Sequence, residues 1–189
     1  PAEESDALIS QFQYTGVFIH EGTSPTERGF TFLGTPVGTP EFVQSSLMGF
    51  LKRFETTLGI LSRVKSVQDQ YLLLTKSLTF KAQHLFRTLG PATTKEFAIQ
   101  FRRLQLQALG HCTTDPDLLL RDTDASRFHA RQAFLSHGQG GLGLLDPEVS
   151  RCIGYIQSWH LMATAANMAT FFPSMQRVME TPLQPDLDS

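Results

Sequence analysis

Apolar residues recur at steps of three and four along most of the chain, which is the spacing of one face of an α-helix. The clearest run follows Thr39-Pro40-Glu41, which supplies a capping hydroxyl, a proline at the first helical position and an acid in the first turn. The apolar positions of that run are 43, 47, 50, 54, 58 and 61. The pattern predicts a helix from Thr39 to about Val64. A second helix is predicted from the cap at Ser66 to Leu89, where Gly90-Pro91 ends it.

Three more helices are predicted further along the chain. Thr93 or Thr94 can cap one that places Phe97, Phe101, Leu104 and Ala108 on one face and ends at Gly110. The next is expected over 124–137. After the glycine turn 138–143, Asp146-Pro147-Glu148 begins a last helix, which we expect to reach about Phe172, before Pro173.

The first part of the chain has a different pattern, which is typical of strands. β-Branched and aromatic residues gather at 14–19 and again at 30–34, with turn-forming residues between them. The two runs are expected to pair as a hairpin, which Pro36 and Gly38 end. The side of the hairpin that we expect to face the helix after Thr39 carries three aromatic side chains: Phe18, Phe30 and Phe32.

The predicted fold class is therefore mainly α, with an N-terminal β-hairpin followed by a bundle of about five helices. We expect a hairpin segment over 1–38, a helical bundle over 39–145, a C-terminal helical extension over 146–180 and a loose tail over 181–189. With 189 residues and 41% hydrophobic residues, the chain can build a core of its own.

Charge is distributed unevenly along the chain, although the net charge is only −2. Residues 1–50 and 132–189 are acidic, with net charges of −5 and −3. Residues 51–131 hold thirteen of the sixteen Lys and Arg residues and have a net charge of +6. Such a basic middle block is either an anion-binding surface or the solvated face of long helices.

The motifs of common catalytic and metal sites are missing or incomplete. Residues 138–143 satisfy G-x-G-x-x-G by letter, but a predicted helix precedes them instead of a strand, so we expect a flexible turn and no dinucleotide site. The six histidines have no H-x-x-x-H spacing, and no metal or cofactor is expected. Two cysteines favour a reducing intracellular compartment, with nucleus, cytoplasm and organelle all open. The uncharged stretch 152–176 contains Gln, His and Asn, which favours a helix buried in protein over one inserted in a membrane.

Two separated segments resemble LINE-type (non-LTR) reverse transcriptases and their relatives. Residues 29–38, GFTFLGTPVG, are similar to the G-x-x-[FY]-L-G-x-P-[IV]-G strand that follows the catalytic palm. Residues 137–144, HGQGGLGL, are similar to the G-G-L-G-[LI] turn beyond the helical thumb, and Ile153-Gly154-Tyr155 match the helix after it. Leu72-Leu73-Leu74 and the downstream stretch 85–88 resemble a helix of the thumb. The resemblance covers roughly residues 15–160.

This resemblance implies that residues 30–36 are a primer-grip hairpin and that the helices between Thr39 and Gly110 are a thumb that holds RNA or a template–primer duplex. Phe32, Leu33, Gly34 and Thr35 carry the match at the hairpin. The basic block then has a role, because Lys and Arg side chains supply most sequence-independent affinity for phosphates. Its candidate contacts are Arg53, Arg63, Lys65, Lys76, Lys81, Arg102 and Arg103.

The chain departs from the family because it has no [FY]-x-D-D motif of the palm. The acidic residues Asp115, Asp117, Asp122 and Asp124 follow the hairpin instead of preceding it. We therefore expect no enzymatic activity from this chain and favour a reverse-transcriptase-derived module that binds RNA or scaffolds a ribonucleoprotein assembly. Protein partners would use the helix over 146–172. Two alternatives stay open: the thumb of an active polymerase whose palm lies upstream of Pro1, and an unrelated helical protein-interaction subunit.

Overall fold

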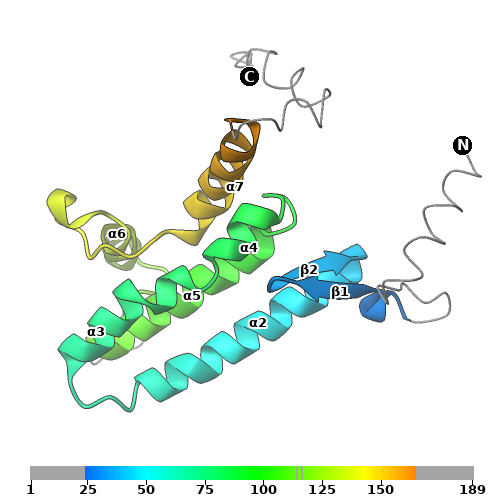
Figure 1. The fold of residues 1–189 in the computed structure, drawn as a ribbon. Coiled ribbons are helices and arrows are strands. Elements are labelled where there is room, and N and C mark those ends of the chain that lie inside the picture. Colours follow the sequence, from blue (N-terminus) through cyan, green and yellow to red (C-terminus); the bar gives the residue numbers. More distant parts are fainter. Residues whose placement is uncertain (1–23, 114, 116, 165–189) are drawn as a thin grey trace, which may run out of the picture.

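The computed structural model describes residues 24–164 with the exception of 114 and 116 (Figure 1). Within them, a two-stranded antiparallel sheet precedes a series of α-helices. The elements are β1 (Gly29–Phe32), β2 (Thr35–Gly38), α2 (Pro40–Leu61), α3 (Val67–Lys76), α4 (Gln83–Thr88), α5 (Lys95–Cys112), α6 (Asp124–Ala133) and α7 (Pro147–Thr164), with 3-10 turns at Pro25–Glu27, Leu78–Phe80 and His137–Gln139. This arrangement confirms the predicted fold class, a hairpin followed by a helical bundle.

The central helices lie side by side along their length. The chain follows α2 in one direction, returns along α3 and α4, and follows α5 in the direction of α2 (Figure 1). α7 rises beside α4 and contacts both α4 and α5. The hairpin lies at the N-terminal end of α2, next to α4, so segments about fifty residues apart in the sequence meet there.

Aromatic side chains fill the core where α2, α4 and α5 meet. Phe86, Phe97 and Phe101 are completely buried. The ring of Phe54 on α2 lies 4.5 Å from that of Phe101, and Phe50 meets the edge of Phe97 at 5.6 Å. Rings at these separations add to the free energy gained from burying apolar area. The cluster therefore fixes the position of α4, and α4 supports the hairpin.

The described partner of the 30–34 strand is the segment directly after it, and the predicted partner at 14–19 lies outside the described residues. β1 pairs with β2 through a two-residue turn, in the register Phe30↔Val37 and Phe32↔Thr35. Leu33 and Gly34 form the turn with φ of 48° and 82°, the left-handed values that match the twist of a tight hairpin.

Pro36 is therefore inside the second strand instead of ending the hairpin. The backbone N–H of Thr39 donates to the carbonyl of Arg28, which makes this pair a hydrogen-bonded one. Hydrogen-bonded and non-hydrogen-bonded pairs alternate along an antiparallel ladder, so the pair of Pro36 with Thr31 is a non-hydrogen-bonded one. The ladder consequently loses no hydrogen bond at the proline.

The predicted orientation of the hairpin was wrong for Phe30 and Phe32. Phe30 and Phe32 are 38% and 61% exposed, whereas Pro36 is buried. A Cβ atom at Gly29 would meet the ring of Phe42 at 2.5 Å, so the side of the sheet with the small residue is the one that approaches α2. Glycine and proline permit this close contact, and the aromatic residues are left on the outer side.

The helix predicted over 66–89 is interrupted. α3 ends at Lys76, a 3-10 turn follows, and α4 begins at Gln83. Hydroxyl groups compete with helical geometry here, because Thr75 and Thr79 donate their side-chain hydrogens to the carbonyls of Tyr71 and Thr75. The apolar stripe continues across the break, and its members Leu74, Leu78, Ala82 and Leu85 are buried.

Most other helix boundaries match the sequence patterns, with two exceptions. The hydroxyls of Thr39 and Ser66 accept from the backbone of α2 and α3 as predicted, but the hydroxyl of Thr94 donates to the carbonyl of Gly90 and does not cap α5. The helix predicted over 124–137 ends at Ala133, because the glycine turn folds back on it: Leu144 donates its backbone N–H to the carbonyl of Ala133.

Residues 138–143 were expected to form a turn, and the backbone conformation of two of its glycines confirms this. Gly140 and Gly143 have φ of 79° and 68°, where glycine is favoured. The last predicted helix begins at Pro147 as expected, with Asp146 accepting from the backbone of Glu148. The strand predicted at 14–19, the helix beyond Thr164 and the tail over 181–189 lie outside the described residues. Within the described residues, no helix has the length and hydrophobicity to cross a membrane.

Candidate nucleic-acid interface

The turn of the hairpin lies against α4 and is held there by polar contacts. The Nε2 atom of His84 is 3.3 Å from the carbonyl oxygen of Gly34. The hydroxyl of Thr35 is 3.1 Å from that of Thr88, one turn further along the same helix. These contacts join residues that are separated by 50 and 53 positions in the sequence. The turn is therefore a fixed projection of the helical body.

Two large apolar side chains are exposed at this turn. Leu33 is 87% exposed and Phe32 is 61% exposed, where β1 passes into the turn before β2. A φ of 48° is unfavourable for leucine by roughly 1 kcal/mol, because its Cβ approaches the following carbonyl oxygen. Exposed apolar residues on a strained turn are a feature of binding sites more than of stable hairpins.

Phe50 and Arg53 on α2 extend this surface. The ring of Phe50 lies 6.4 Å from the imidazole of His84 and connects it to the aromatic core. Arg53 is three residues further on, so its side chain leaves α2 on the same side, and it is exposed. Lys81, three residues before His84, is exposed at the start of the α4 segment. We call Phe32, Leu33, Gly34, Arg53, Lys81 and His84 the hairpin-tip surface.

Most basic residues of the middle block form no ion pair with the described carboxylates. Exposed side chains of this kind lie on α2, α3, α4 and α5 and in the turns between them: Lys52, Arg53, Arg63, Lys65, Lys76, Lys81, Arg87, Lys95 and Arg103. Their charges are available to an external anion.

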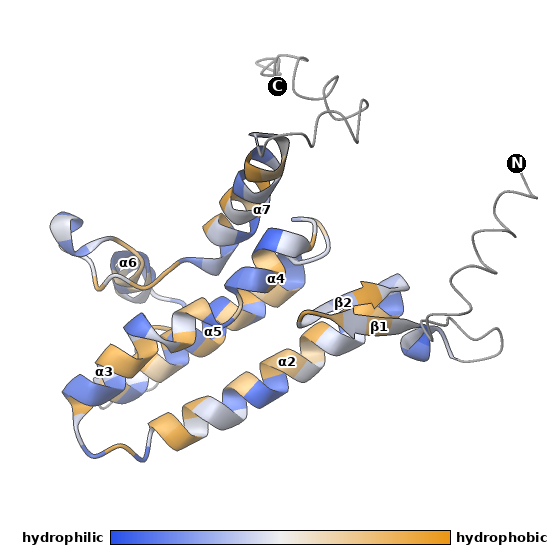
Figure 2. Ribbon diagram, in the orientation of Figure 1, coloured by the Kyte–Doolittle hydropathy of each residue, from blue (hydrophilic) through white to orange (hydrophobic). Residues whose placement is uncertain are grey.

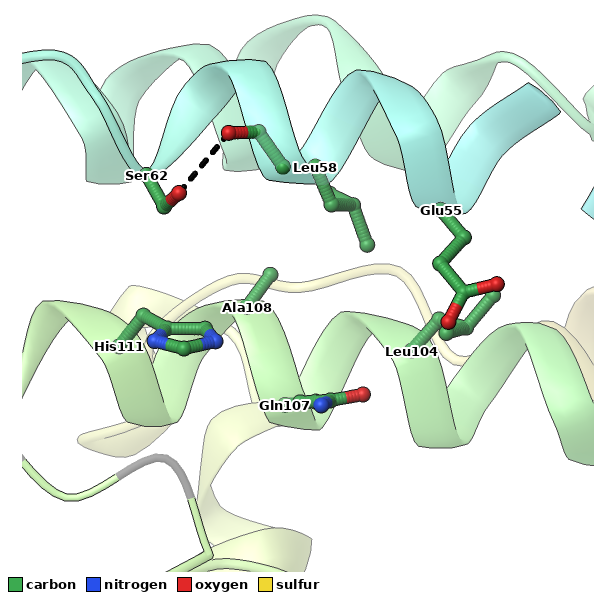
Figure 3. Close-up of a pocket in the computed structure, with 8 residues that line it drawn as sticks. Glu55, Leu58, Ser62, Leu104, Gln107, Ala108 and His111 are labelled. Atoms are coloured by element: carbon green, nitrogen blue, oxygen red, sulfur yellow. Dashed lines mark hydrogen bonds between the residues drawn. The ribbon is translucent and has the colours of Figure 1, made fainter. Parts of the chain in front are cut away.

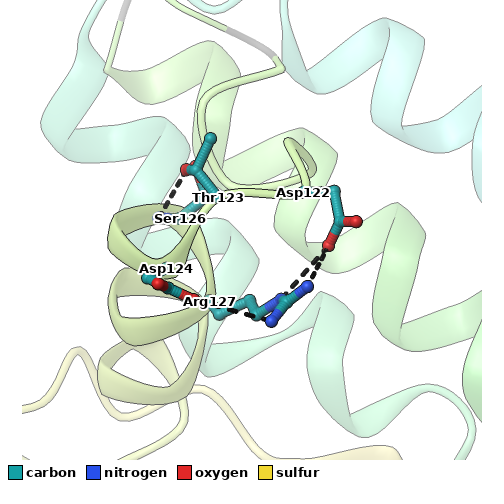
Figure 4. Close-up of polar contacts among 5 residues, drawn as sticks. All are labelled: Asp122, Thr123, Asp124, Ser126 and Arg127. Carbon is teal, nitrogen blue, oxygen red and sulfur yellow. Dashed lines mark hydrogen bonds and ion pairs between the residues drawn. The ribbon is translucent and has the colours of Figure 1, made fainter.

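The arginines of the following segment are paired with carboxylates of their own chain. Arg121 contacts Asp115 at 2.7 Å. Figure 4 shows Arg127 between Asp122, to which it donates at 3.1 Å, and Asp124, at 3.5 Å. The carboxylate of Asp115 also accepts from the backbone N–H of Asp117. These acids therefore bind groups of their own chain.

Arg102 differs from its neighbour Arg103. Its guanidinium contacts Asp146 at 3.6 Å and Glu148 at 3.2 Å and lies 4.8 Å from the centre of the Phe134 ring. Arg102 therefore connects α5 to the start of α7, and its charge is already compensated. Arg103 is exposed.

Arg103 lies on a groove between α2 and α5, on a different side of α2 from the hairpin tip. The groove has two connected parts of about 600 and 140 Å³ that share Glu55, Leu104 and Gln107. Figure 3 shows Glu55 and Leu58 of α2 facing Leu104 and Ala108 of α5, with His111 at the far end. Lys52 and Arg103 line the wider part together with Glu55 and Glu96, so its charges balance. This groove is not a basic surface.

The predicted contact residues therefore do not lie together on one surface of the structure. The hairpin residues contact His84 and Thr88 of α4, and Lys81 is three residues before His84, whereas Arg63 and Lys65 lie at the corner between α2 and α3. Lys76 ends α3, next to the break before α4. Sequence reasoning missed His84, Thr88 and Phe50, which position the hairpin. No local signal could have found them, because each acts through a contact with a distant segment.

The described titratable residues contain no metal-binding cluster and one thiol whose pKa is shifted. No group of three or more His, Cys, Asp or Glu side chains within the described residues could hold a metal ion. Burial raises the pKa of the Cys112 thiol, which donates to the carbonyl of Ala108 at 3.5 Å, so this thiol stays protonated near neutral pH.

Comparisons of the chain with protein-family models, with curated proteins and with solved structures found no match.

Proposed function

We propose that this chain is a non-catalytic, thumb-like helical module that binds RNA or a template–primer duplex as part of a larger ribonucleoprotein assembly. The observation that carries the proposal is the contrast between two groups of basic residues. Those of α2 to α5, apart from Arg102, have no carboxylate partner among the described residues, whereas Arg121 and Arg127 are paired. Unpaired Lys and Arg side chains gain more from a phosphate than paired ones, because no existing ion pair has to break.

The hairpin-tip surface combines the two groups that nucleic-acid binding needs. Arg53 and Lys81 provide positive charge for the backbone, and Phe32 provides an exposed ring on which an unpaired base can stack. Gly34 lacks a Cβ atom, which allows a nucleic-acid strand to approach the turn closely. Binding by these groups depends on charge and stacking, so it is largely independent of sequence.

A pair of phenylalanine variants tests the role of the tip. Phe32→Ala removes the exposed ring of the hairpin, and Phe128→Ala removes a ring of similar exposure, 64%, from α6. We expect Phe32→Ala to weaken binding of a single-stranded RNA about fivefold to a hundredfold, since base stacking on an aromatic ring contributes about 1–3 kcal/mol. Phe128→Ala should leave the affinity unchanged. Fluorescence anisotropy of a labelled RNA and of an RNA–DNA hybrid measures both.

The result separates the proposal from a general surface effect. Equal loss of affinity in both variants would show that the exposed rings act without regard to position, and no detectable binding by the parent chain would remove the proposal. Circular dichroism of each variant provides the control for folding, and neither ring is part of the buried core.

A further inference from the structure

A hollow between α5 and α6 brings four arginine side chains together. They are Arg102 of α5, Arg121 of the loop before α6, and Arg127 and Arg131 of α6. Among the described residues that line the hollow, Asp122 is the one acid. The volume is about 370 Å³, which lies in the usual range of small-molecule sites, about 300–1,000 Å³. The excess of positive charge favours an anionic ligand.

The buried residues that line this hollow are apolar. Leu106 and Leu119 are 6% and 8% exposed, Ala130 is 9% exposed, and all three belong to the hydrophobic core. The arginines therefore surround an apolar floor that packing holds in place. Small-molecule sites commonly combine such a floor with a few polar groups, which bind one end of the ligand.

Arg131 supplies a positive charge that no described carboxylate compensates. Its side chain is exposed and, unlike those of the other three arginines, forms no ion pair with the described residues. It follows Arg127 by four residues on α6, which is more hydrophilic than α2, α3, α5 and α7 (Figure 2). Side chains four residues apart lie on the same side of a helix, and two like charges there repel each other. An anion between them would remove this repulsion.

The paired arginines keep hydrogen-bond donors for a ligand. A guanidinium has five N–H groups. Arg121 contacts Asp115 through one nitrogen, and Arg127 donates two hydrogen bonds to Asp122 (Figure 4). The side chain of Asp122 is 88% exposed, and an exposed ion pair contributes little to stability. A ligand can therefore use the remaining donors without breaking a strong interaction.

We propose that this hollow binds a phosphate monoester that carries an apolar or planar group. A monoester has a charge of about −1.5 to −2 near neutral pH and three terminal oxygens, so several guanidinium groups can bind it at once. A carboxylate offers one charge and two oxygens, which fewer of these groups can share. A phosphodiester inside an RNA strand has a single charge, so this site differs from the basic residues of α2 to α5. The inference does not rest on nucleic-acid binding.

Calorimetric titration of the full chain, in a buffer without phosphate, tests the ligand class with three probes. Phenyl phosphate has both parts of the proposed ligand, inorganic phosphate lacks the ring, and benzoate has a carboxylate in place of the phosphate. We expect phenyl phosphate to bind at least about tenfold more tightly than inorganic phosphate, because its ring covers the apolar floor. It should bind more tightly than benzoate by a similar factor, because benzoate has a single charge.

Two matched variants locate the binding site. Arg131→Gln removes the uncompensated charge of the hollow, and Arg63→Gln removes an arginine outside the hollow that is also exposed and unpaired among the described residues. We expect Arg131→Gln to raise the dissociation constant of phenyl phosphate about tenfold or more, because hydrogen bonds between charged groups are strong ones. Arg131→Lys keeps the charge but loses the planar fork, so its effect should be smaller. Arg63→Gln should leave the dissociation constant unchanged.

Three results would overturn the inference. The first is a parent chain that binds no phenyl phosphate at concentrations up to about 1 mM. The second is an affinity for inorganic phosphate or benzoate equal to that for phenyl phosphate, since the ring or the second charge would then contribute nothing. The third is an equal rise of the dissociation constant in Arg131→Gln and Arg63→Gln.

Two short RNAs distinguish a free phosphate ester from the end of a nucleic-acid strand. Competition with phenyl phosphate by an RNA with a 5′-phosphate, but not by the same RNA with a 5′-hydroxyl, would support the site and identify a strand end as a source of the monoester. No competition by either RNA would support a free small molecule as the ligand. Competition by both would contradict the inference, because phosphodiesters would then be sufficient.

Discussion

At the scale of single residues, Leu33 shows a conflict between local stability and exposure. It occupies the first position of a two-residue turn with a positive φ, where Asn, Asp or Gly is favoured, and its side chain is 87% exposed to solvent. Neither the backbone nor the core gains from a leucine at this position. A leucine at this position is explained if its side chain contacts a ligand.

Replacing Leu33 should therefore separate stability from binding. Leu33→Asn creates an Asn-Gly turn and should raise the free energy of unfolding by about 0.5–1 kcal/mol, because asparagine adopts the left-handed conformation with less strain. The same variant should bind RNA more weakly. Urea unfolding and anisotropy measure the two effects.

The matched control for this variant is Leu73→Asn, at a leucine of α3 that is 47% exposed. Asparagine is a poorer helix former than leucine, so Leu73→Asn should lower the stability by about 0.5 kcal/mol and leave RNA binding unchanged. Stronger or unchanged RNA binding by Leu33→Asn would contradict a contact at the turn.

The burial of individual residues was the feature that sequence patterns predicted least well. The apolar stripe of α5 was predicted to include Leu104, yet that side chain is only half-buried, whereas its neighbour Gln105 is completely buried. Neither polar atom of the Gln105 amide has a hydrogen-bond partner within the described residues. A pattern of hydrophobic positions assigns glutamine to the surface, so this burial depends on helix packing that the sequence alone does not display.

At the scale of elements, α4 and α7 pack closely on each other at Gly154. The space at Gly154 accepts a Cβ atom at ordinary contact distances from Arg87 and Phe86. The sequence indicated Gly154 only through the family resemblance and predicted neither the end of α3 at Lys76 nor the approach of α7. Both depend on contacts between distant segments, whereas the caps at Thr39 and Ser66 are local and were predicted.

Two substitutions at Gly154 measure this contact. Gly154→Ala should raise the free energy of unfolding by about 0.5–1 kcal/mol through helix propensity. Gly154→Leu should lower it by about 1–3 kcal/mol, since the longer side chain must displace α4. Gly59 on α2 is the control: a Cβ atom there meets nothing within 4 Å, so both alanine and leucine should stabilise. A stabilising Gly154→Leu, by urea unfolding, would mean that α7 does not pack closely on α4.

At the scale of the whole molecule, the distribution of charge connects the sequence to the proposed function. The sequence predicted the basic middle block, and the structure shows which of its members are compensated: Arg102, Arg121 and Arg127 contact carboxylates. The block could be found by counting residues. Its division into paired and unpaired side chains could not be found in this way, because Arg102 pairs with residues more than forty positions away.

The thumb-like role depends on this division, so it predicts unequal effects of equal changes in charge. Arg53→Gln with Lys81→Gln removes two unpaired charges beside the hairpin tip. Arg121→Gln with Arg127→Gln removes two charges that already contact carboxylates. Both double variants change the net charge by the same amount, so a long-range effect of total charge would alter them alike.

The most direct measurement is the salt dependence of binding to a single-stranded RNA and to an RNA–DNA hybrid, for the parent chain and both double variants. We predict that Arg53→Gln with Lys81→Gln weakens binding and flattens the log–log slope by up to about 0.7–0.9 for each phosphate that is no longer neutralised. Arg121→Gln with Arg127→Gln should leave the slope within about 0.3 of the parent value. Equal slopes for the parent and for Arg53→Gln with Lys81→Gln, at unchanged affinity, would contradict the nucleic-acid-binding function.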